Sequence, residues 1–326
     1  MKRIQKKVDK VMRRFSRILL SAPPAVDAPR DREVITGDPF LPPELEREIF
    51  ELAARNDPVD SWTHQHVGDT LLVLPQVCRR VQSWIEPFIY ERVSLLQSFN
   101  GAQPVPKFLA TVDARPASFF ATHVKYLYMD YSVPLPVVQR ILGVCTGAVS
   151  VGCHHPYPSL AHVLAPLPLH RLCVSEFALP SPAATLPPWA ASLRQLGFTK
   201  AIPPDPAAAF AALPALTHLA VDYDALPNPD DPGMGAALAR LLDACPRLRL
   251  LVLMTGAKTD CRWAYQRLRE DGFAIGDPRF YVHLRPIPDG LWDAWSRRVP
   301  DVFVEAEGQL ERRRAVAAAA VAKSGS

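Results

Sequence analysis

The sequence predicts an α/β fold in which a short helical bundle precedes a series of short parallel strands that alternate with helices. Two observations predict it. An apolar frame of the form L-x-x-L-x-L recurs six times between residues 124 and 253, with amphipathic segments between its copies. Proline is also frequent, at 34 of 326 residues, which is about twice its usual share, while glycine is scarce. This composition suits short elements that stop often.

Residues 1–20 are predicted to form a basic amphipathic leader. They contain eight basic residues and one acidic residue, with apolar residues at helical spacing between them. The whole chain carries a formal net charge of +4, so the rest of it is mildly acidic. A helix of this kind lies on anionic surfaces. A transit peptide, a nuclear signal, a peripheral membrane contact and a solvated leader without a dedicated role all remain open. Residues 21–38 hold several prolines and are interpreted as a linker.

The sequence also indicates a compartment. The leader is not followed by the continuous apolar run that a secretory signal needs. The longest apolar stretch near the end, Ala315–Ala322, is far shorter than the roughly 18 residues of a membrane-spanning helix. The six cysteines are scattered without a C-x-x-C pair, which favours buried thiols over disulfides or a zinc site. We therefore expect a cytoplasmic or nuclear protein.

The sequence pattern of residues 39–90 predicts two helices. The segment LPPELEREIFEL, residues 41–52, has two prolines at a helix entrance and apolar residues on one side of the following turns. A second apolar stripe with helical spacing runs from Leu71 to Ile85, and Pro87 is expected to end it. Helices this short need packing partners, so the two are predicted to form a small bundle.

These two helices resemble an F-box, in particular the F-box-like leader of many fungal proteins. The resemblance is carried by Leu41-Pro42-x-Glu44-Leu45 with Ile49-Phe50, and then by Leu71-Leu72, Val77-Cys78-Arg79-Arg80-Val81 and the stretch from Trp84 to Tyr90. It implies a bundle that docks on a Skp-type adaptor and so tethers the chain to a cullin ubiquitin ligase. The adaptor-binding residues that it implies are Leu41, Pro42, Leu45, Ile49, Val77 and Trp84, with Cys78, Val81 and Trp84 shared between interface and core.

The six copies of the apolar frame predict six strands. Their first positions are 24, 21, 24, 23 and 32 residues apart. Because alternate residues of a strand share a face, the second and third apolar residues of each frame are expected to point to the same side. Tyr90-Val93-Leu95 and Phe280–Leu284 are expected to extend the series at its two ends. The frames are Val124-Leu127-Met129, Ala148-Val151-Cys153, Leu169-Leu172-Val174, Leu193-Leu196-Phe198, Leu216-Leu219-Val221 and Leu248-Leu251-Leu253.

Between the frames, amphipathic segments such as 137–145 and 238–245 predict outer helices. Proline stands just before several frames, where it ends a helix without the loss of a ladder hydrogen bond. The pattern resembles leucine-rich repeat proteins of the F-box type over residues 90–285, with four of the five steps inside the range of 20 to 29 residues. It lacks the asparagine or cysteine expected eight positions after each first leucine. The resemblance therefore implies an irregular solenoid with a parallel strand face and outer helices.

The predicted organisation has five segments. The last one, residues 289–326, is expected to be a capping helix and a frayed tail, in which Gly290–Val299 caps the last strand and Glu305–Lys323 forms an exposed helix. The others are the basic amphipathic leader 1–20, the Pro-rich linker 21–38, the F-box-like helical domain 39–90 and the leucine-rich-repeat-like domain 91–288.

No cluster of reactive side chains predicts a catalytic, metal or cofactor site. Cys153-His154-His155 with His162 offers one thiol and no second spaced pair, so a strand-end cysteine followed by solvent-facing histidines is favoured over a zinc site. The carboxylates of residues 222–231 lie among prolines and lack the pattern of a calcium loop. No nucleotide-binding, hydrolase or metalloprotease motif occurs. Basic residues outside the leader do not cluster with aromatic residues, so nucleic-acid binding is not expected.

The sequence thus predicts a non-catalytic substrate receptor of a cullin-type ubiquitin ligase. Residues 39–90 would bind the Skp-type adaptor, and the concave strand face of residues 90–285 would hold a protein target. The alternative is a repeat scaffold with no link to a ligase, recruited to a membrane surface through residues 1–20. Copurification of the adaptor distinguishes the two.

Overall fold

The structure, a computed structural model, describes residues 41–55, 69–95, 104–129, 131–177, 186–198, 210, 213–222, 234–255, 261–284 and 302–324. The chain forms two compact units. Within the described ranges, the first unit comprises residues 41–55 and 69–86, and the second begins at Pro87. The predicted leader, residues 1–20, and the linker, residues 21–38, lie outside the described residues.

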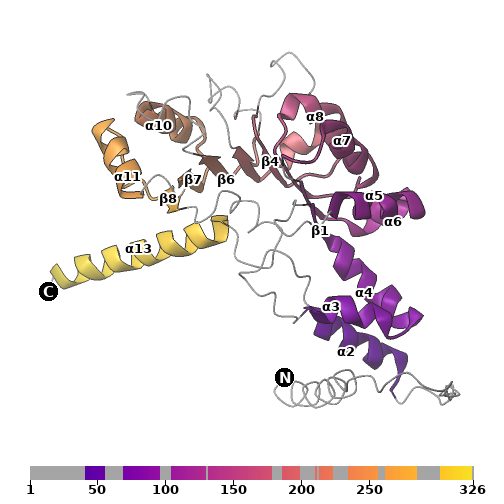
Figure 1. The fold of residues 1–326 in the computed structure, drawn as a ribbon. Helices are drawn as coiled ribbons and strands as arrows, with labels where there is room; N and C mark the ends of the chain where they lie inside the picture. The colour runs from indigo at the N-terminus through magenta and orange to yellow at the C-terminus, as the bar shows by residue number, and fades with distance from the viewer. Residues whose placement is uncertain are drawn as a thin grey trace, which may run out of the picture. The chain divides into compact units, whose positions relative to one another are not determined.

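The first unit is helical (Figure 1). Pro43 opens its first helix, where the fixed φ of proline suits the first helical position. Glu44 and Glu46 lie in the first turn, where negative charge stabilises the helix dipole. The predicted helix over residues 41–52 is confirmed. The elements are α2 Pro43–Arg55, α3 Asp69–Val73, the 3-10 turn η1 Leu74–Gln76 and α4 Arg79–Glu91. The buried apolar residues of the unit are Ala54, Leu71, Leu74, Val81 and Ile85.

The second predicted helix differs from the structure. Its apolar stripe, residues 71–85, is divided between α3, η1 and α4, and Pro87 lies inside α4 rather than ending it. The break comes at Pro75 in η1, because proline has no N–H to continue the ladder of α3. Pro87 removes only one hydrogen bond of α4. The helix then continues into the second unit, where the ring of Tyr90 packs edge-on against Phe119 at 5.0 Å.

The second unit contains one parallel sheet of eight strands (Figure 1). Each strand is hydrogen-bonded to the next one in the sequence, so the spatial order runs from β1 to β8. All six frames and both predicted extensions form strands. The strands are β1 Arg92–Leu95, β2 Tyr126–Met129, β3 Ser150–Cys153, β4 Arg171–Val174, β5 Gln195–Phe198, β6 His218–Asp222, β7 Leu250–Thr255 and β8 Phe280–Leu284.

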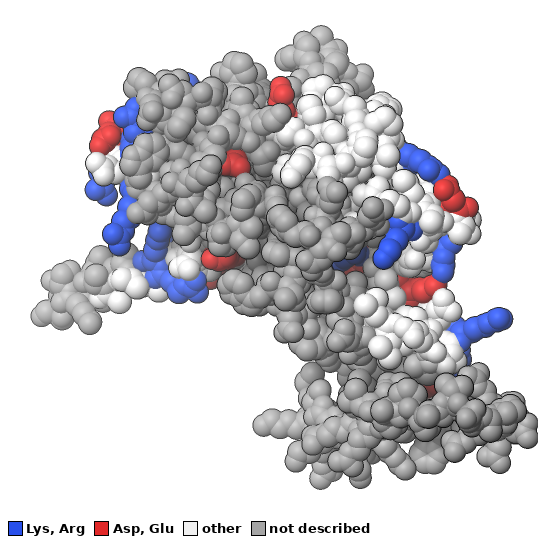
Figure 2. All heavy atoms as spheres, viewed as in Figure 1, with Lys and Arg blue, Asp and Glu red and all other residues white. Residues whose placement is uncertain are grey.

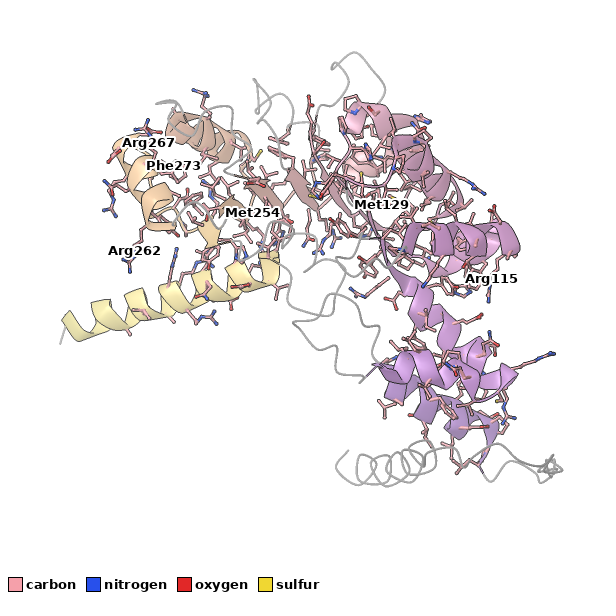
Figure 3. The ribbon with its side chains drawn as sticks, viewed as in Figure 1. Arg115, Met129, Met254, Arg262, Arg267 and Phe273 are labelled. Atoms are coloured by element: carbon pink, nitrogen blue, oxygen red, sulfur yellow. The ribbon has the colours of Figure 1, made fainter. Side chains whose placement is uncertain are left out.

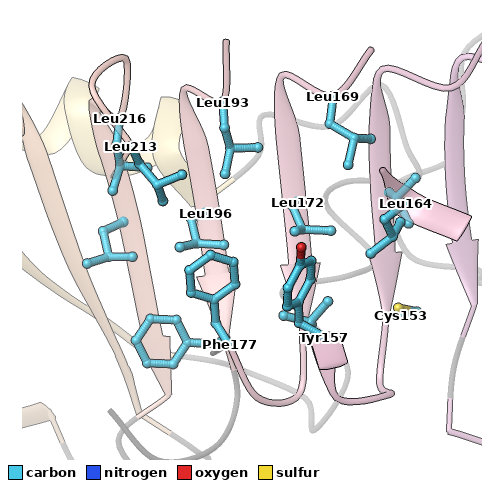
Figure 4. Close-up of a cluster of buried hydrophobic side chains, with 14 of the residues drawn as sticks. Cys153, Tyr157, Leu164, Leu169, Leu172, Phe177, Leu193, Leu196, Leu213 and Leu216 are labelled. Atoms are coloured by element: carbon cyan, nitrogen blue, oxygen red, sulfur yellow. The ribbon is translucent and has the colours of Figure 1, made fainter. Parts of the chain in front are cut away.

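Equivalent apolar residues of neighbouring frames lie opposite one another. Leu172 of β4 pairs in register with Leu196 of β5, which pairs with Leu219 of β6. The leucines therefore stack from strand to strand on one face of the sheet, the core face (Figure 4). Every apolar position of the six frames is at most 3% exposed. The frame thus fixes both the position of each strand and the face that it buries.

Helices cover the core face. Helices α7 and α10 coincide with the two predicted outer helices, and Ile141 of α7 and Leu241 of α10 are fully buried in the same cluster as the frames. The elements on this face are α5 Pro104–Ala114, α6 Ala117–His123, α7 Leu135–Val144, α8 Tyr157–Leu164, the 3-10 turn η2 Pro188–Ala191, α10 Met234–Ala244 and α11 Cys261–Glu270.

Proline stands at the starts of helices as well as just before strands. Pro116, Pro134, Pro156 and Pro187 each stand just before a helix or 3-10 turn in an extended conformation, with φ between −61° and −66°. Their carbonyl groups accept the first hydrogen bonds of the following turn, as in Val138 N–H to Pro134 at 3.0 Å. Because the ring fixes φ and the missing N–H is not needed there, proline suits both ends of these short helices. The sequence predicted proline before the strands, and it predicted proline at a helix start only for residues 41–52.

Helix α13, Val302–Ser324, lies on the opposite face of the sheet, here named the second face (Figure 1). The sequence predicts an exposed helix over Glu305–Lys323. That prediction is wrong for the first turns, because the helix begins three residues earlier and buries one side. The buried residues are Val302, Phe303, Ala306 and Leu310. No described helix is long and apolar enough to cross a membrane.

Candidate functional site

Most of the predicted adaptor-binding side chains lie on the surface of the first unit. Leu41, Leu45 and Val77 are 37%, 48% and 47% exposed, and Pro42 is also exposed. Ile49 is half-buried and lies four residues after Leu45, so the two share one side of α2. Large apolar side chains in water cost free energy until a partner covers them, so this surface fits an interface.

Trp84, the sixth predicted residue, connects α4 to α2. Its ring lies 6.4 Å from the ring of Phe50, and the guanidinium of Arg80 lies 5.5 Å from the centroid of the Trp84 ring. Arg80 also forms an ion pair with Glu46 of α2. These contacts hold the two helices together, so Trp84 is half-buried and packs within the unit.

The two other residues that were expected to be shared between interface and core differ from each other. Val81 is fully buried and belongs to the core of the unit. Cys78 is exposed and contributes nothing to that core.

Two exposed apolar residues of α3 were not predicted as site residues. Leu72 and Val73 are 46% and 36% exposed. The run Leu71-Leu72-Val73-Leu74 indicated their exposure. Residues three apart in a helical segment share a face, so if Leu71 and Leu74 face the core, the two residues between them point elsewhere. Leu71 and Leu74 are buried accordingly.

The second face of the sheet, predicted to hold a protein target, is buried at its central positions. Tyr128, Cys173, Ala220 and Val252 come from four different strands and are at most 3% exposed. With the buried residues of α13 they form one apolar cluster, which also contains Met254 of β7 (Figure 3). A target at these positions would have to displace α13 from the β6–β8 end of the face.

Polar contacts fix α13 over this end of the sheet. Arginine side chains gather over α11 and α13 in Figure 2. Arg313 donates a hydrogen bond of 3.1 Å to the hydroxyl of Tyr265 on α11, and Arg314 donates one of 2.7 Å to the carbonyl of Pro278. Near the start of the helix, Glu307 accepts a hydrogen bond of 3.0 Å from Nε2 of His218.

The cysteine and histidines at the end of β3 point in different directions. Cys153 is buried on the core face, and this burial raises the pKa of its thiol to about 12. His154 contacts the Tyr128 hydroxyl at 3.3 Å, while Nε2 of His155 donates to the carbonyl of Val133 at 2.8 Å. Both histidines are half-buried rather than solvent-facing. Across the described ranges, no group of three metal-ligating side chains is placed to hold an ion.

Asp222 is buried in β6, and the other carboxylates of the predicted acidic loop, residues 223–231, lie outside the described residues. So do the predicted capping segment 290–299 and the basic leader on which the scaffold alternative depends.

No protein-family model, no curated protein and no solved structure matches this chain.

Proposed function

We propose that the chain is a non-catalytic substrate receptor of a cullin-type ubiquitin ligase. Its first unit would be an F-box-like bundle that binds a Skp-type adaptor, and residues 91–288 would be a leucine-rich-repeat-like solenoid that binds a protein target. One observation carries the proposal. Of the nine large apolar side chains that are exposed among the described residues, five belong to the smaller first unit.

The composition of this surface supports a protein partner. Exposed apolar side chains that cluster on a small unit mark an interaction site. Leu41, Leu45 and Val77 take no part in the buried core of the unit, which is built from other residues. The unit therefore has an apolar interior and a separate apolar exterior, as a docking module requires.

The mechanism of such a receptor is proximity. A target held on the second unit and an adaptor held on the first are parts of one tethered assembly, which raises the effective concentration of the target near the ligase. The chain then needs no catalytic side chain of its own. Its contribution is to bind the adaptor through one surface and the target through another.

Binding of a purified Skp-type adaptor to the full chain tests the proposal. Leu45→Asp combined with Val77→Asp places two charges on the exposed surface and should weaken adaptor binding at least about 30-fold, since residues at the centre of an interface contribute about 2 kcal/mol or more each. Both side chains are about half exposed, so the fold should be retained. Isothermal titration calorimetry measures the affinity and circular dichroism checks the fold.

The matched control is Val316→Asp, which also places a charge at an exposed valine, 71% accessible on α13. It should bind the adaptor as the wild type does. Absence of binding by the wild-type chain, or equal binding by the double variant, would contradict the proposal.

A further inference from the structure

Helix α13 has a side that faces away from the sheet. Its buried residues, Val302, Phe303, Ala306 and Leu310, share one side of the helix and pack on the second face. The opposite side is here named the exposed face of α13. Its residues are exposed except for Gly308, which is half-buried. The exposed face consists of Val304, Gly308, Glu311, Arg312, Ala315 and Ala319.

The exposed face has the spacing of a seam between two helices. Val304, Gly308, Glu311 and Ala315 are separated by four, three and four residues, which is the spacing of the inward positions in paired helices. From Val304 to Ala319 the face is about 22 Å long, at a rise of about 1.5 Å per residue. Apart from Glu311 and Arg312 its side chains are small, so a second helix could approach to about 8 Å.

Gly308 is not required by contacts within the chain. Glycine in a helix interior is less stable than alanine. A Cβ atom at Gly308 would have a single atom within 4 Å, the Nη1 of Arg312 at 3.9 Å, so alanine would fit there. A second helix that crosses the exposed face closely would instead need the small residue.

The exposed face is complementary to itself in an antiparallel arrangement. When a two-fold axis passes between residues 311 and 312, the face of one copy meets the same face of a second copy, and every contact occurs twice. Small residues then lie opposite small or apolar ones, and a carboxylate lies opposite a guanidinium. The opposite pairs are Glu311 with Arg312, Gly308 with Ala315, and Val304 with Ala319.

The two central charges are available to a second copy. Among the described residues, neither Glu311 nor Arg312 forms an ion pair, and both are exposed. Arg312 donates one hydrogen bond, of 3.4 Å, from Nε to the side chain of Gln309, which leaves its other N–H groups for a carboxylate. A parallel arrangement would place Glu311 opposite Glu311, so the charges favour the antiparallel one.

We propose that the chain forms a homodimer in which two copies of α13 pack antiparallel through their exposed faces. The dimer does not depend on the proposed function, because α13 belongs to the second unit and the proposed adaptor-binding residues belong to the first. A membrane surface fits this face less well, since helices that bind membranes carry large apolar residues such as Trp, Phe and Leu. The face is smaller than the standard interface of about 800 Å² per partner, so the dimer should be weak.

Charge reversal at the centre of the face tests the proposal on the full chain. The wild type should be partly dimeric at about 0.1–1 mM. Glu311→Arg and Arg312→Glu each place like charges opposite one another twice, so each should weaken dimerisation at least about tenfold. Both changes in one chain exchange the two charges and should restore the dimer. Sedimentation equilibrium measures the dissociation constant, and circular dichroism checks the fold.

A mixture of the two single variants gives a sharper result, because only their mixed dimer has opposite charges at every central contact. The mixed dimer should therefore be tighter than the dimer of either variant alone. Arg240→Glu, a charge reversal at an exposed arginine of α10, is the matched control and should dimerise as the wild type does. A wild type that is monomeric at about 1 mM, or a dimer that neither reversal weakens, would overturn the proposal.

Disulfide cross-linking tests the antiparallel register. The substitutions Gly308→Cys in one chain and Ala315→Cys in another lie opposite each other, within reach of a disulfide. Two copies of Gly308→Cys are about 10 Å apart along the helices. Under mild oxidation the mixture should form linked dimers faster than either variant alone, with the wild type and its exposed Cys78 as background. Faster linkage of Gly308→Cys alone would indicate a parallel pair and overturn the proposal.

Discussion

At the scale of single residues, close backbone approach limits substitution at Gly147. This residue lies in the turn between α7 and β3 and packs against α6. A Cβ atom at Gly147 would lie 1.9 Å from the carbonyl oxygen of Ala121, a distance that no side chain could occupy without a shift of the backbone. Only glycine fits there, and its lack of a side chain allows α6 to pack closely against this turn.

Gly147→Ala should therefore lower the free energy of unfolding by about 1–3 kcal/mol, the usual cost of forcing atoms into a packed site. Urea denaturation followed by circular dichroism measures the change. Gly143→Ala is the matched control, because Gly143 lies inside α7 and no atom lies within 4 Å of the added Cβ. It should be neutral or stabilise the protein by up to about 1 kcal/mol. Equal losses in both variants would refute the role assigned to Gly147.

At the scale of single elements, α13 is an amphipathic helix only over its first turns. Phe303 is 1% exposed, and its ring lies 5.3 Å from that of His218 on β6. Residues 311–316, farther along the same helix, are exposed. The apolar packing of the helix is thus confined to its first turns. Beyond them the helix is held by the hydrogen bonds of Arg313 and Arg314 and by helix propensity, to which its alanines contribute.

Phe303→Ala should loosen this attachment. Removal of a buried phenylalanine costs about 3–5 kcal/mol when the site cannot collapse, and the loss should be local to α13 and the second face. Hydrogen exchange should rise most in residues 302–310 and in β6. Val316→Ala, at a position 71% exposed on the same helix, should change stability by less than about 0.5 kcal/mol. Unchanged exchange in β6 after Phe303→Ala would contradict the assigned contact.

The sequence was most informative where a single face of an element is buried. The eight strands were all predicted, because each frame has apolar residues at the positions that meet the helices. The position of α13 was not predicted, although β7 offered a signal. Leu250, Val252 and Met254 are apolar on the face opposite the frame, which is typical of a strand covered on both sides.

The exposed surface of the first unit could be predicted from the sequence only in part. Periodicity places Leu74 and Val77 on one stripe, yet Leu74 is buried and Val77 is 47% exposed. The 3-10 turn between α3 and α4 changes the rotation of the chain at this point, and a periodic pattern contains no information about such a break. Pro75 was the residue that indicated it.

At the scale of the whole molecule, the sheet is held by contacts between neighbours in the sequence. Each strand pairs only with the strands before and after it in the chain. Stability of such an array is close to a sum of local terms, so a defect in one strand should weaken its neighbours more than distant strands. This property is a consequence of the strand order and does not depend on the function.

Leu196→Ala tests this property at the middle of the sheet. Leu196 of β5 is fully buried between Leu172 and Leu219, so its truncation should cost about 2–5 kcal/mol. Hydrogen exchange of the native protein should then rise most in β4, β5 and β6 and fall off toward β1 and β8, because the cost is carried by the two adjacent interfaces. Leu196→Met keeps the volume and should cost less than about 1.5 kcal/mol. An equal rise in all eight strands would mean that the sheet unfolds as one cooperative unit, and the nearest-neighbour account would be wrong.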